Sequence, residues 1–351
     1  MTHRRIDCRI HRRLVAAAAG FAMLAAACGS SSSSTSPKSG TAAGSSDAPL
    51  VVGYSAWPGW FPLAVAEEQK LFEKAGLKVE LKFFADYTAS LDALVAGKID
   101  VNAQTLNDTL LGVAAGSDQR VIVVNDNSTG NDQVICDASI TSVKGLSGKK
   151  IAAETGVVDH FLLLQGLAKV GMTEKDINFT GLKTDAAAAA FAGGEFDCVA
   201  VFAPFTVQAL KRAGSKVLFS SADFPGAIPD HLVATPAAVA ERPADLQKLV
   251  DAWYLTLDYL KDNAAAANKV MAKASGLSEA EYADLAQGTT LFTADQAMAA
   301  FTDRPDDPTS LPAMARQINP FLVSAGLAKK EADLSKVFDS SFTKTHLDSR
   351  S

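Results

Sequence analysis

A nine-residue pattern that occurs twice in this chain constrains its fold more than any other feature. Segments 93–101 and 190–198 both lead from a helix-like stretch through Gly and a charged residue into an apolar strand. Asp100 in the first segment corresponds to Asp197 in the second, 97 positions later, which is about the length of one small α/β unit. An internal repeat of this kind favours two similar lobes over one large sheet.

Strand-like and helix-like segments alternate through both halves of the chain. The predicted strands are 49–54, 78–83, 99–103, 120–125, 150–153, 177–180, 196–202 and 216–220, and the predicted helices are 63–74, 90–96, 159–170 and 186–192. This order predicts an α/β protein with parallel sheets and helices on both faces. After about residue 237 the chain is Ala-rich and helical, and we expect these helices to return to lobe one.

The N-terminal segment has the features of an export signal. Five Arg residues precede the apolar stretch 14–27, which is too short to span a bilayer as a permanent helix. The small residues 25–27 before Cys28 are similar to a bacterial lipobox, with Ala25 in place of the usual Leu. We predict that residues 1–28 are a lipoprotein signal peptide and that Cys28 is lipidated. The alternative is an ordinary secretory signal with an incidental Cys.

The next segment, 29–49, consists almost entirely of Gly, Ser, Thr, Ala and Pro. This composition cannot bury a core, so we predict a flexible tether with a reach of about 25 Å. After it we expect lobe one to begin with residues 50–134, lobe two to comprise residues 135–230, and residues 231–351 to complete lobe one with C-terminal helices.

Charge and composition exclude several classes of function. The net charge is −6 and no basic cluster follows residue 13, which argues against a nucleic-acid partner. After the N-terminal segment only His160, His231 and His346 remain, without a Cys or His pair at metal-ligand spacing. No phosphate-binding loop is present either, so we predict no metal and no cofactor. Cys136 and Cys198 either form one disulfide or remain buried thiols.

Aromatic residues follow the first strand, where ligands of open α/β sheets bind. Trp57 and Trp60 lie in a loop with two Pro residues, which favours them as pocket walls over the alternative that they cover the lobe's own core. Similar reasoning applies to the polar residues after the other strands, although many of them also suit helix N-caps. The predicted ligand-binding residues are Trp57, Trp60, Asp86, Gln104, Asn107, Asn127, Asp132, Glu154, Thr155, Asp159, His160 and Phe202.

The neighbouring Asp159 and His160 raise the question of catalysis. No Ser or Cys in a nucleophile setting such as Gly-x-Ser-x-Gly accompanies them, so we predict that the protein is not an enzyme. Segment 125–132, rich in Asn and Asp, is predicted to be a loop that acts as a hinge or a pocket rim.

Several segments together resemble one family. Val52-Gly53-Tyr54 leading into Trp57-Pro58-Gly59-Trp60, segments 94–100 and 143–152, and segment 192–197 are similar to the nitrate/sulfonate/taurine family of ABC solute-binding proteins. The resemblance implies a type II periplasmic-binding fold, with two lobes joined by crossover strands near 133–138 and 230–235. The sequence departs from many relatives at 202–205, where a Trp-Glu-Pro-Trp-like stretch is common.

The resemblance implies a receptor that binds a small solute and delivers it to ABC permease subunits. We expect a monomer on the outer face of a bacterial cytoplasmic membrane, with membrane contact through the lipid anchor only. The predicted cleft loops carry several carboxylates and no Lys or Arg, which favours a small nitrogenous or cationic solute such as an amine, guanidine or urea-like compound. The alternatives are an aliphatic sulfonate, taurine or nitrate held by backbone amides, and a sensory or scaffold lipoprotein without a transporter.

Overall fold

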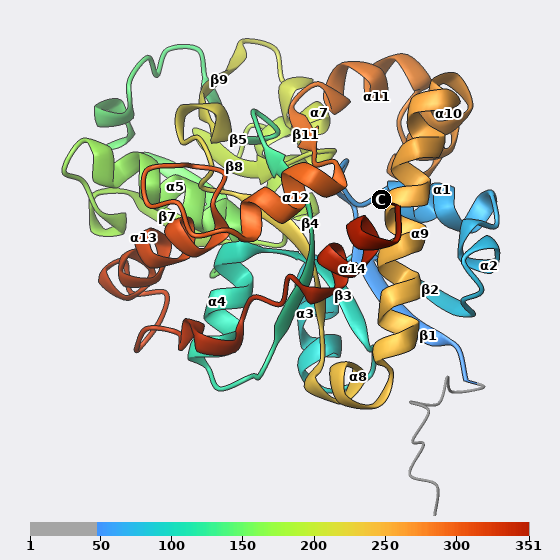
Figure 1. Ribbon diagram of the computed structural model, residues 1–351. Helices are drawn as coiled ribbons and strands as arrows, with labels where there is room; N and C mark the ends of the chain where they lie inside the picture. The colour runs from blue at the N-terminus through green and yellow to red at the C-terminus, as the bar shows by residue number, and fades with distance from the viewer. Residues whose placement is uncertain (1–47, 351) are drawn as a thin grey trace, which may run out of the picture. The chain divides into compact units, whose positions relative to one another are not determined.

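The computed structural model describes residues 48–350 (Figure 1). The predicted signal peptide with Cys28, and the predicted tether apart from its last two residues, lie outside the described residues. No helix within residues 48–350 has both the length and the apolar character that crossing a bilayer requires.

Two β-sheets organise the described residues, and each is the centre of one lobe. Sheet A, in lobe one, has the strand order β11 (Thr289–Leu291), β4 (Arg120–Ser128), β10 (Pro229–Ala234), β3 (Val101–Thr105), β1 (Leu50–Ser55) and β2 (Val79–Phe84). Sheet B, in lobe two, has the order β7 (Asn178–Gly181), β6 (Lys150–Ala153), β8 (Cys198–Phe202), β5 (Asp132–Asp137) and β9 (Ser215–Ser220).

The chain passes between the sheets twice, from β4 to β5 and from β9 to β10. The predicted crossover strands 133–138 and 230–235 correspond to β5 and β10, the strands that follow these two passages. Both sheets are mixed, so the predicted parallel pairing holds for part of each sheet. Strands β1, β2 and β3 pair in parallel, whereas β10 enters from the other lobe and runs antiparallel to β3 and β4. Strand β5 is likewise antiparallel to β8 and β9.

Helices cover both sheets. The helices in the first two thirds of the chain are α1 (Pro62–Glu68), α2 (Leu71–Lys74), α3 (Tyr87–Val95), α4 (Leu106–Ala114), α5 (Val158–Lys169), α6 (Thr184–Ala192) and α7 (Phe205–Leu210). The later ones are α8 (Pro236–Glu241), α9 (Pro243–Asp262), α10 (Ala264–Ser275), α11 (Glu279–Ala286), α12 (Ala294–Phe301), α13 (Leu311–Ser324) and α14 (Ser341–Arg350). Short 3₁₀ turns are Val143–Leu146, Glu174–Asp176, Ser221–Asp223 and Leu334–Lys336.

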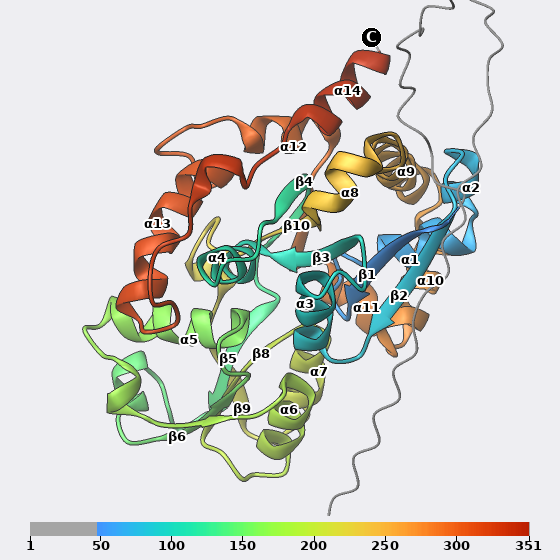
Figure 2. The same ribbon diagram turned by 90° about the horizontal axis from the view of Figure 1, so that it is seen from below.

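The C-terminal helices pack on lobe one, as predicted. Helix α9 contacts α1 and α2 and buries Trp253, while α12 and α14 contact β4. Helix α13 contacts more than this lobe. It packs on α4, and its Phe321 ring also meets Phe161 of α5 in lobe two at a centroid distance of 5.7 Å. Figure 2 shows one end of α13 next to α5.

Three local differences from the sequence-based expectation have simple causes. The predicted helix 63–74 is divided into α1 and α2, because Lys70 adopts a left-handed backbone with φ of 55°. Residues 125–128, expected in a loop, continue β4 by pairing with β10 and β11. Helix α4 was not predicted, although the Thr105 hydroxyl caps it by accepting from the amide of Asp108.

Cys136 and Cys198 form a disulfide, which decides between the two alternatives left open by the sequence. The two residues are directly opposite each other in the antiparallel pair β5 and β8, and both are fully buried. The bond therefore joins a strand that connects the lobes to the centre of sheet B.

The disulfide should stabilise the folded chain, because it closes a loop across a sequence separation of 62 and thereby restricts the unfolded state. The double substitution Cys136→Ala/Cys198→Ala is expected to lower the free energy of unfolding by about 2–4 kcal/mol. Urea unfolding monitored by circular dichroism measures this difference. Wild-type protein unfolded and refolded with reductant present is the control and should match the double variant. Equal midpoints for oxidised wild type and double variant would contradict the expectation.

Candidate functional site

A narrow cavity with a free volume of about 10 Å³ lies between the two sheets. Its walls come from the loop after β1, from α3, β3 and α5, and from the strands that connect the lobes. The lining residues are Trp57, Trp60, Tyr87, Thr105, Asp132, Val158, Phe202, Ile228 and Asp230. Because both sheets and both connections contribute, the cavity belongs to the interface between the lobes.

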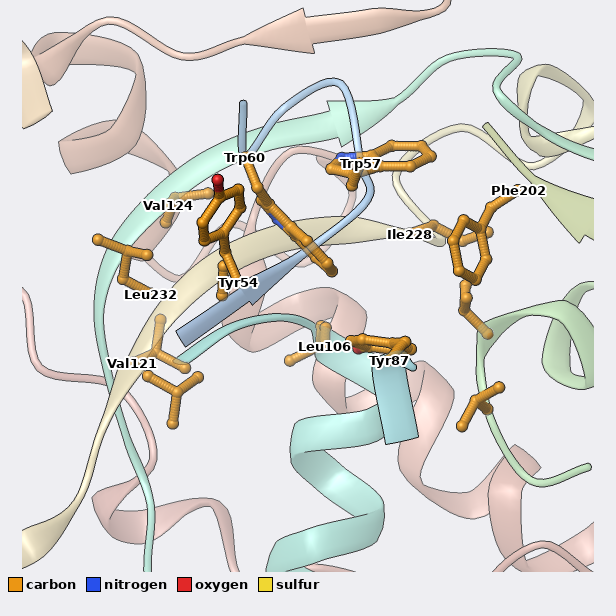
Figure 3. Close-up of a cluster of buried hydrophobic side chains, with 14 of the residues drawn as sticks. Tyr54, Trp57, Trp60, Tyr87, Leu106, Val121, Val124, Phe202, Ile228 and Leu232 are labelled. Carbon is orange, nitrogen blue, oxygen red and sulfur yellow. The ribbon is translucent and has the colours of Figure 1, made fainter. Parts of the chain in front are cut away.

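Four aromatic side chains form most of the apolar wall, and Figure 3 shows them around one space. The ring of Tyr87 lies 5.5 Å from that of Trp60 and 6.0 Å from that of Phe202, and the ring of Trp57 lies 6.4 Å from that of Phe202. All four are buried. Lobe one supplies three of these rings and lobe two supplies Phe202, so closure of the lobes completes the wall.

The loop that carries the two Trp residues packs tightly on a carboxyl group. The Trp57 indole Nε1–H donates to Asp126 Oδ1 at 3.0 Å. A Cβ atom at Gly59 would lie 1.9 Å from Asp126 Oδ2, so only glycine lets the backbone approach this closely. The loop is thus held over Asp126, which lies behind the cavity wall.

Buried carboxylates surround the cavity. Asp132 and Asp230 line it, and Asp126 lies opposite Asp230 in the pairing of β4 with β10. Within the described residues Asp230 has no hydrogen-bond partner besides the carboxyl group of Asp126, and Asp132 Oδ2 has none. Each of the three side chains is at most 1% exposed. Buried acceptors without donors are unfavourable unless another group completes them.

Burial dominates the electrostatics of this cluster. It raises the pKa of Asp126 and of Asp132 to about 7, and it raises the pKa of Asp230 well above the ordinary range. Asp108 also has a pKa raised to about 7 by burial, although the hydroxyls of Thr105 and Tyr87 donate to it at 2.7 Å and 2.9 Å. Neighbouring carboxylates raise the pKa values of Asp108, Asp126 and Asp230 further, whereas a hydrogen bond with Ser128 lowers that of Asp132. No Lys or Arg of the described chain is among the causes.

An ion-pair network closes the margin of the cavity. Lys183 Nζ lies 3.0 Å from Asp86 Oδ1 in lobe one and 3.0 Å from Glu154 Oε1 in lobe two. The Thr88 hydroxyl at the start of α3 also donates to Glu154. The network therefore joins the lobes in a closed arrangement. No Lys or Arg was predicted in the cleft loops, and Lys183 at the margin corrects this prediction.

The structure brings several predicted site residues together. Trp57, Trp60, Asp132 and Phe202 line the cavity. Asp159 lies buried in the first turn of α5, where Oδ2 accepts from the Thr184 hydroxyl at 2.8 Å and Oδ1 lacks a donor in the described chain. Asp86 and Glu154 belong to the network at the margin.

Other predicted site residues lie away from the cavity. Gln104 Nε2 donates to Thr109 and Gln119 inside lobe one, because alternate side chains of a strand point to opposite faces. Asn107 donates to Asp108 in the first turn of α4.

Three more predicted residues are not among those that line the cavity. Asn127 is half-buried on β4, and its Oδ1 has no partner in the described residues. Thr155 is exposed. His160 stacks on Phe179 at a centroid distance of 4.4 Å and bonds Glu174 at 2.5 Å, on the outer side of α5.

Five lining residues were not predicted: Tyr87, Thr105, Val158, Ile228 and Asp230. Tyr87 and Thr105 stand next to predicted residues in the loops after strands, so a broader choice within these loops would have included them. Asp230 had been assigned only to a crossover strand. Its position at the start of that strand, beside the polar end of β4, was the available signal. No group of three or more His, Cys, Asp or Glu residues within 48–350 is arranged to hold a metal ion.

The profile of the NMT1-like family matches residues 43–275. The match covers more than half of the chain, and the chain belongs to the NMT1-like family. This result confirms the resemblance to the nitrate/sulfonate/taurine group of solute-binding proteins.

Two relatives are similar over part of their length. A candidate binding protein of Brucella abortus (strain 2308) is 28% identical over 213 residues, which cover 59% of this chain and 65% of that protein. A candidate aliphatic sulfonates-binding protein of Escherichia coli (strain K12) is 29% identical over 201 residues, which cover 56% of this chain and 62% of that protein. The chain thus spans less than two thirds of the length of these relatives.

Solved structures show the same fold. The alkanesulfonate-binding protein of Xanthomonas axonopodis pv. citri, bound to MOPS, has a TM-score of 0.71 at 21% identity, covering 85% of this chain and 100% of that chain. A desulfurization enzyme has a TM-score of 0.60 at 15% identity, covering 86% of this chain and 99% of its own. The predicted two-lobed periplasmic-binding fold is confirmed, and receptors and an enzyme share it.

The buried carboxyl groups should make the solute-free protein less stable as the pH rises. Their pKa values near 7 exceed the value of about 3.9 for Asp in unfolded chains, so the folded state binds more protons between about pH 4 and pH 7. The free energy of unfolding is therefore expected to fall through this range and to stay low above it. Thermal melting from pH 5 to pH 8 measures the change, since a loss of 1 kcal/mol lowers the melting temperature by about 2–4 °C.

Two substitutions test the origin of this dependence. Asp132→Asn should flatten the pH profile, because it removes one of the buried ionisable groups. Asp295→Asn, at an exposed position in the first turn of α12, should leave the profile unchanged. A flat profile for the wild type would contradict the burial of these charges.

Proposed function

We propose that this chain is the extracytoplasmic solute-binding receptor of an ABC importer, which captures one small polar solute between its lobes and delivers it to permease subunits without chemical change. The observation that carries the proposal is the enclosed cavity, whose walls come from both sheets and from both connections between them. Movement about these connections would open the cavity to solvent and close it again over a solute. The family and the names of the relatives support the same function.

The relatives favour an aliphatic sulfonate as the solute, which the sequence analysis had given as an alternative. The relatives do not support the nitrogenous cation that the sequence favoured, since the names of the Escherichia coli and Xanthomonas proteins refer to sulfonates. One feature of the cavity suits an anion. Helix α5 begins beside the cavity at Val158, and its N-cap residue Val157 provides no side-chain cap. Free amides at a helix N-terminus favour negative charge.

A small nitrogenous cation is the second candidate, and a different observation favours it. Two buried carboxylates and four aromatic side chains line the cavity, whereas no Lys or Arg of the described residues does. A cation would find both charge partners and aromatic faces there. The geometry of the cavity and the names of the relatives thus point to solutes of opposite charge.

The remaining features of the proposed receptor come from the sequence. Lobe one would comprise residues 50–134 and 231–351, and lobe two residues 135–230. Lipidation at Cys28 would hold a monomeric receptor at the outer face of the cytoplasmic membrane, with the segment 29–49 as its tether. The periplasmic solute-binding relatives among solved structures support this location.

A solute should raise the melting temperature of the purified receptor. Guanidinium, urea, taurine, ethanesulfonate and nitrate are tested separately by differential scanning fluorimetry. A ligand present at a hundred times its dissociation constant stabilises the folded state by about 2.7 kcal/mol. A shift with at least one compound supports the receptor function, and a shift with sulfonates alone favours the first candidate. No shift with any of these compounds would count against the proposal.

Trp57→Ala should weaken binding of the active compound more than about tenfold, because it removes one wall of the cavity and the donor to Asp126. Isothermal titration calorimetry measures the affinity, and circular dichroism checks the fold. The control is Phe83→Ala, which removes an aromatic ring that is 49% exposed and does not line the cavity. Equal affinities for both variants and the wild type would show that the solute binds elsewhere.

A further inference from the structure

This inference rests on the proposed receptor function and names the solute class of the same cavity. We infer that Asp132 and Asp230 bind a small planar organic cation with N–H groups on more than one edge, of the guanidinium or amidinium class. We also infer that this cation displaces a proton that Asp126 and Asp230 share when the cavity holds no solute.

The first argument is the distribution of charge. Two carboxyl groups line the cavity, Asp132 from β5 and Asp230 from β10, and two more lie close behind its wall, Asp126 from β4 and Asp108 from α4. Their interactions with one another are repulsive, and no basic side chain of residues 48–350 lines the cavity. Lys183 is already bonded to Asp86 and Glu154 at the margin.

Asp159 and Glu154 add two more carboxyl groups near the cavity. Asp159 on α5 interacts unfavourably with Asp132, Glu154 and Asp108. Those of these groups that are ionised would repel an anionic solute at low local dielectric, whereas a cation would stabilise their charged forms.

The second argument is the supply of hydrogen-bond donors. The lining hydroxyls of Tyr87 and Thr105 donate to Asp108, and the Trp57 indole donates to Asp126. Of the side-chain donors that line the cavity, only Trp60 Nε1 lacks an acceptor in the described chain. A sulfonate, with three oxygens to satisfy, would find one free side-chain donor there.

The acceptors show the opposite balance. Asp230 and Asp132 line the cavity, and within residues 48–350 Asp132 Oδ2 has no donor, while Asp230 has none besides the Asp126 carboxyl group. Apart from the proton shared with Asp126, these buried oxygens call for a solute that brings several N–H groups. Guanidinium and amidinium groups present paired N–H donors that match carboxylate oxygens in bidentate geometry.

The third argument is shape. The rings of Trp57, Trp60, Tyr87 and Phe202 offer faces on which a delocalised planar cation stacks favourably (Figure 3). In this closed arrangement the free volume of the cavity is about 10 Å³, roughly the space of one water molecule. The lobes must therefore separate before a solute enters, and a small, flat solute requires the least separation. A bare metal ion fits less well, since the described acidic residues form no cluster of three with metal-ligand geometry.

The shared proton is inferred from the pairing of β4 with β10, which brings two carboxyl groups together. Asp126 and Asp230 are opposite each other on β4 and β10, and both are fully buried. Two adjacent carboxyl groups in such a setting do not both ionise, and they hold a shared proton between their oxygens. Burial and the neighbouring acid raise the pKa of Asp230 well above the ordinary range.

No cation faces this pair from the surrounding elements of the described chain. The ionisable groups that face it are Asp132 from β5 and Asp108 from α4, which disfavour ionisation, and Tyr282 from α11, which stays a neutral phenol because burial and Asp126 raise its pKa. Among residues 48–350, the hydrogen bonds that favour the charged form of Asp126 come from the Trp57 indole and from Asp230. A bound cation would supply the missing positive charge, and the shared proton would then leave to the solvent.

Calorimetric titration of the mature full-length chain tests the inference with four probes. Guanidinium carries charge and N–H groups, urea carries N–H groups without charge, tetramethylammonium carries charge without N–H groups, and ethanesulfonate is an anion. Each is used at millimolar concentration after treatment with a metal chelator, far below the molar range in which guanidinium denatures proteins. We expect guanidinium to bind at least about tenfold more tightly than each of the other three, because only it satisfies both charge and donors.

The displaced proton is measured in the same titrations. Between pH 6 and pH 7 the heat of guanidinium binding, compared in two buffers of different ionisation enthalpy, should show release of a proton. The affinity should accordingly rise by up to about tenfold per pH unit in this range. Guanidinium binding without proton release and without pH dependence would overturn the displacement.

Variants identify the binding residues. Asp230→Asn and Asp132→Asn should each lower the guanidinium affinity by more than about thirtyfold, and Asp295→Asn should leave it unchanged. Both cavity variants should also raise the melting temperature of the solute-free protein at pH 8, because each removes an uncompensated buried charge. Lost binding together with a raised melting temperature excludes misfolding as the cause. Unchanged affinity in both variants would overturn the assignment.

The outcomes separate this inference from the receptor function. Tighter binding of ethanesulfonate than of guanidinium would overturn the cationic class and leave the receptor proposal intact. Equal binding of tetramethylammonium would overturn the requirement for N–H groups. If none of the four probes bound, the inference would fail, and the wider set of solutes named above would decide the receptor function separately.

Discussion

The insertion of β10 between β3 and β4 is the constraint on which the site depends. This strand returns from lobe two and runs antiparallel to both neighbours. Its register places Asp230 opposite Asp126 on one side and opposite Thr105 on the other. Because strand side chains alternate, a shift of one residue would turn Asp230 away from the cavity. Strand register, more than loop composition, therefore decides which carboxyl groups meet.

The cost of this arrangement appears in the hydrogen bonds around it. Tyr87 and Thr105 direct their hydroxyls to Asp108, and the Trp57 indole reaches Asp126, so part of the buried charge is compensated within lobe one. Asp230 receives no such help from the described residues. A folded chain that only needed stability would place apolar side chains here, and uncompensated polar groups of this kind are typical of functional sites.

The sequence was sufficient for the fold because its periodicity and internal repeat are local signals. It also identified Trp57, Trp60, Asp132 and Phe202, which lie at strand ends where the fold class places a ligand. It could not identify Asp230, because the position of that residue depends on pairing between strands more than a hundred residues apart in the chain. His160, by contrast, was predicted at the site and does not line the cavity.

A helix start near a cleft indicated that His160 could reach a solute, but the helical period directs its ring to Phe179 and Glu174 on the outer side. The prediction for Gln104 was wrong for a similar reason, since strand alternation points its side chain into lobe one, where it donates to Thr109. In both cases the sequence predicted that the backbone lies near the cleft but did not predict the direction of the side chain.

Helix α13 adds a mechanical link outside the cavity. It is packed on α4, yet its Phe321 meets Phe161 on α5 edge to face. Any rotation that separates the lobes must break this ring contact or carry α13 along with α5. An aromatic pair of this geometry is worth about 0.5–1.5 kcal/mol, which corresponds to a factor of about 2 to 13 in an equilibrium between two conformers. The share of time that an empty receptor spends open is thus set in part by two side chains that never meet the solute, so affinity can be tuned without changing selectivity.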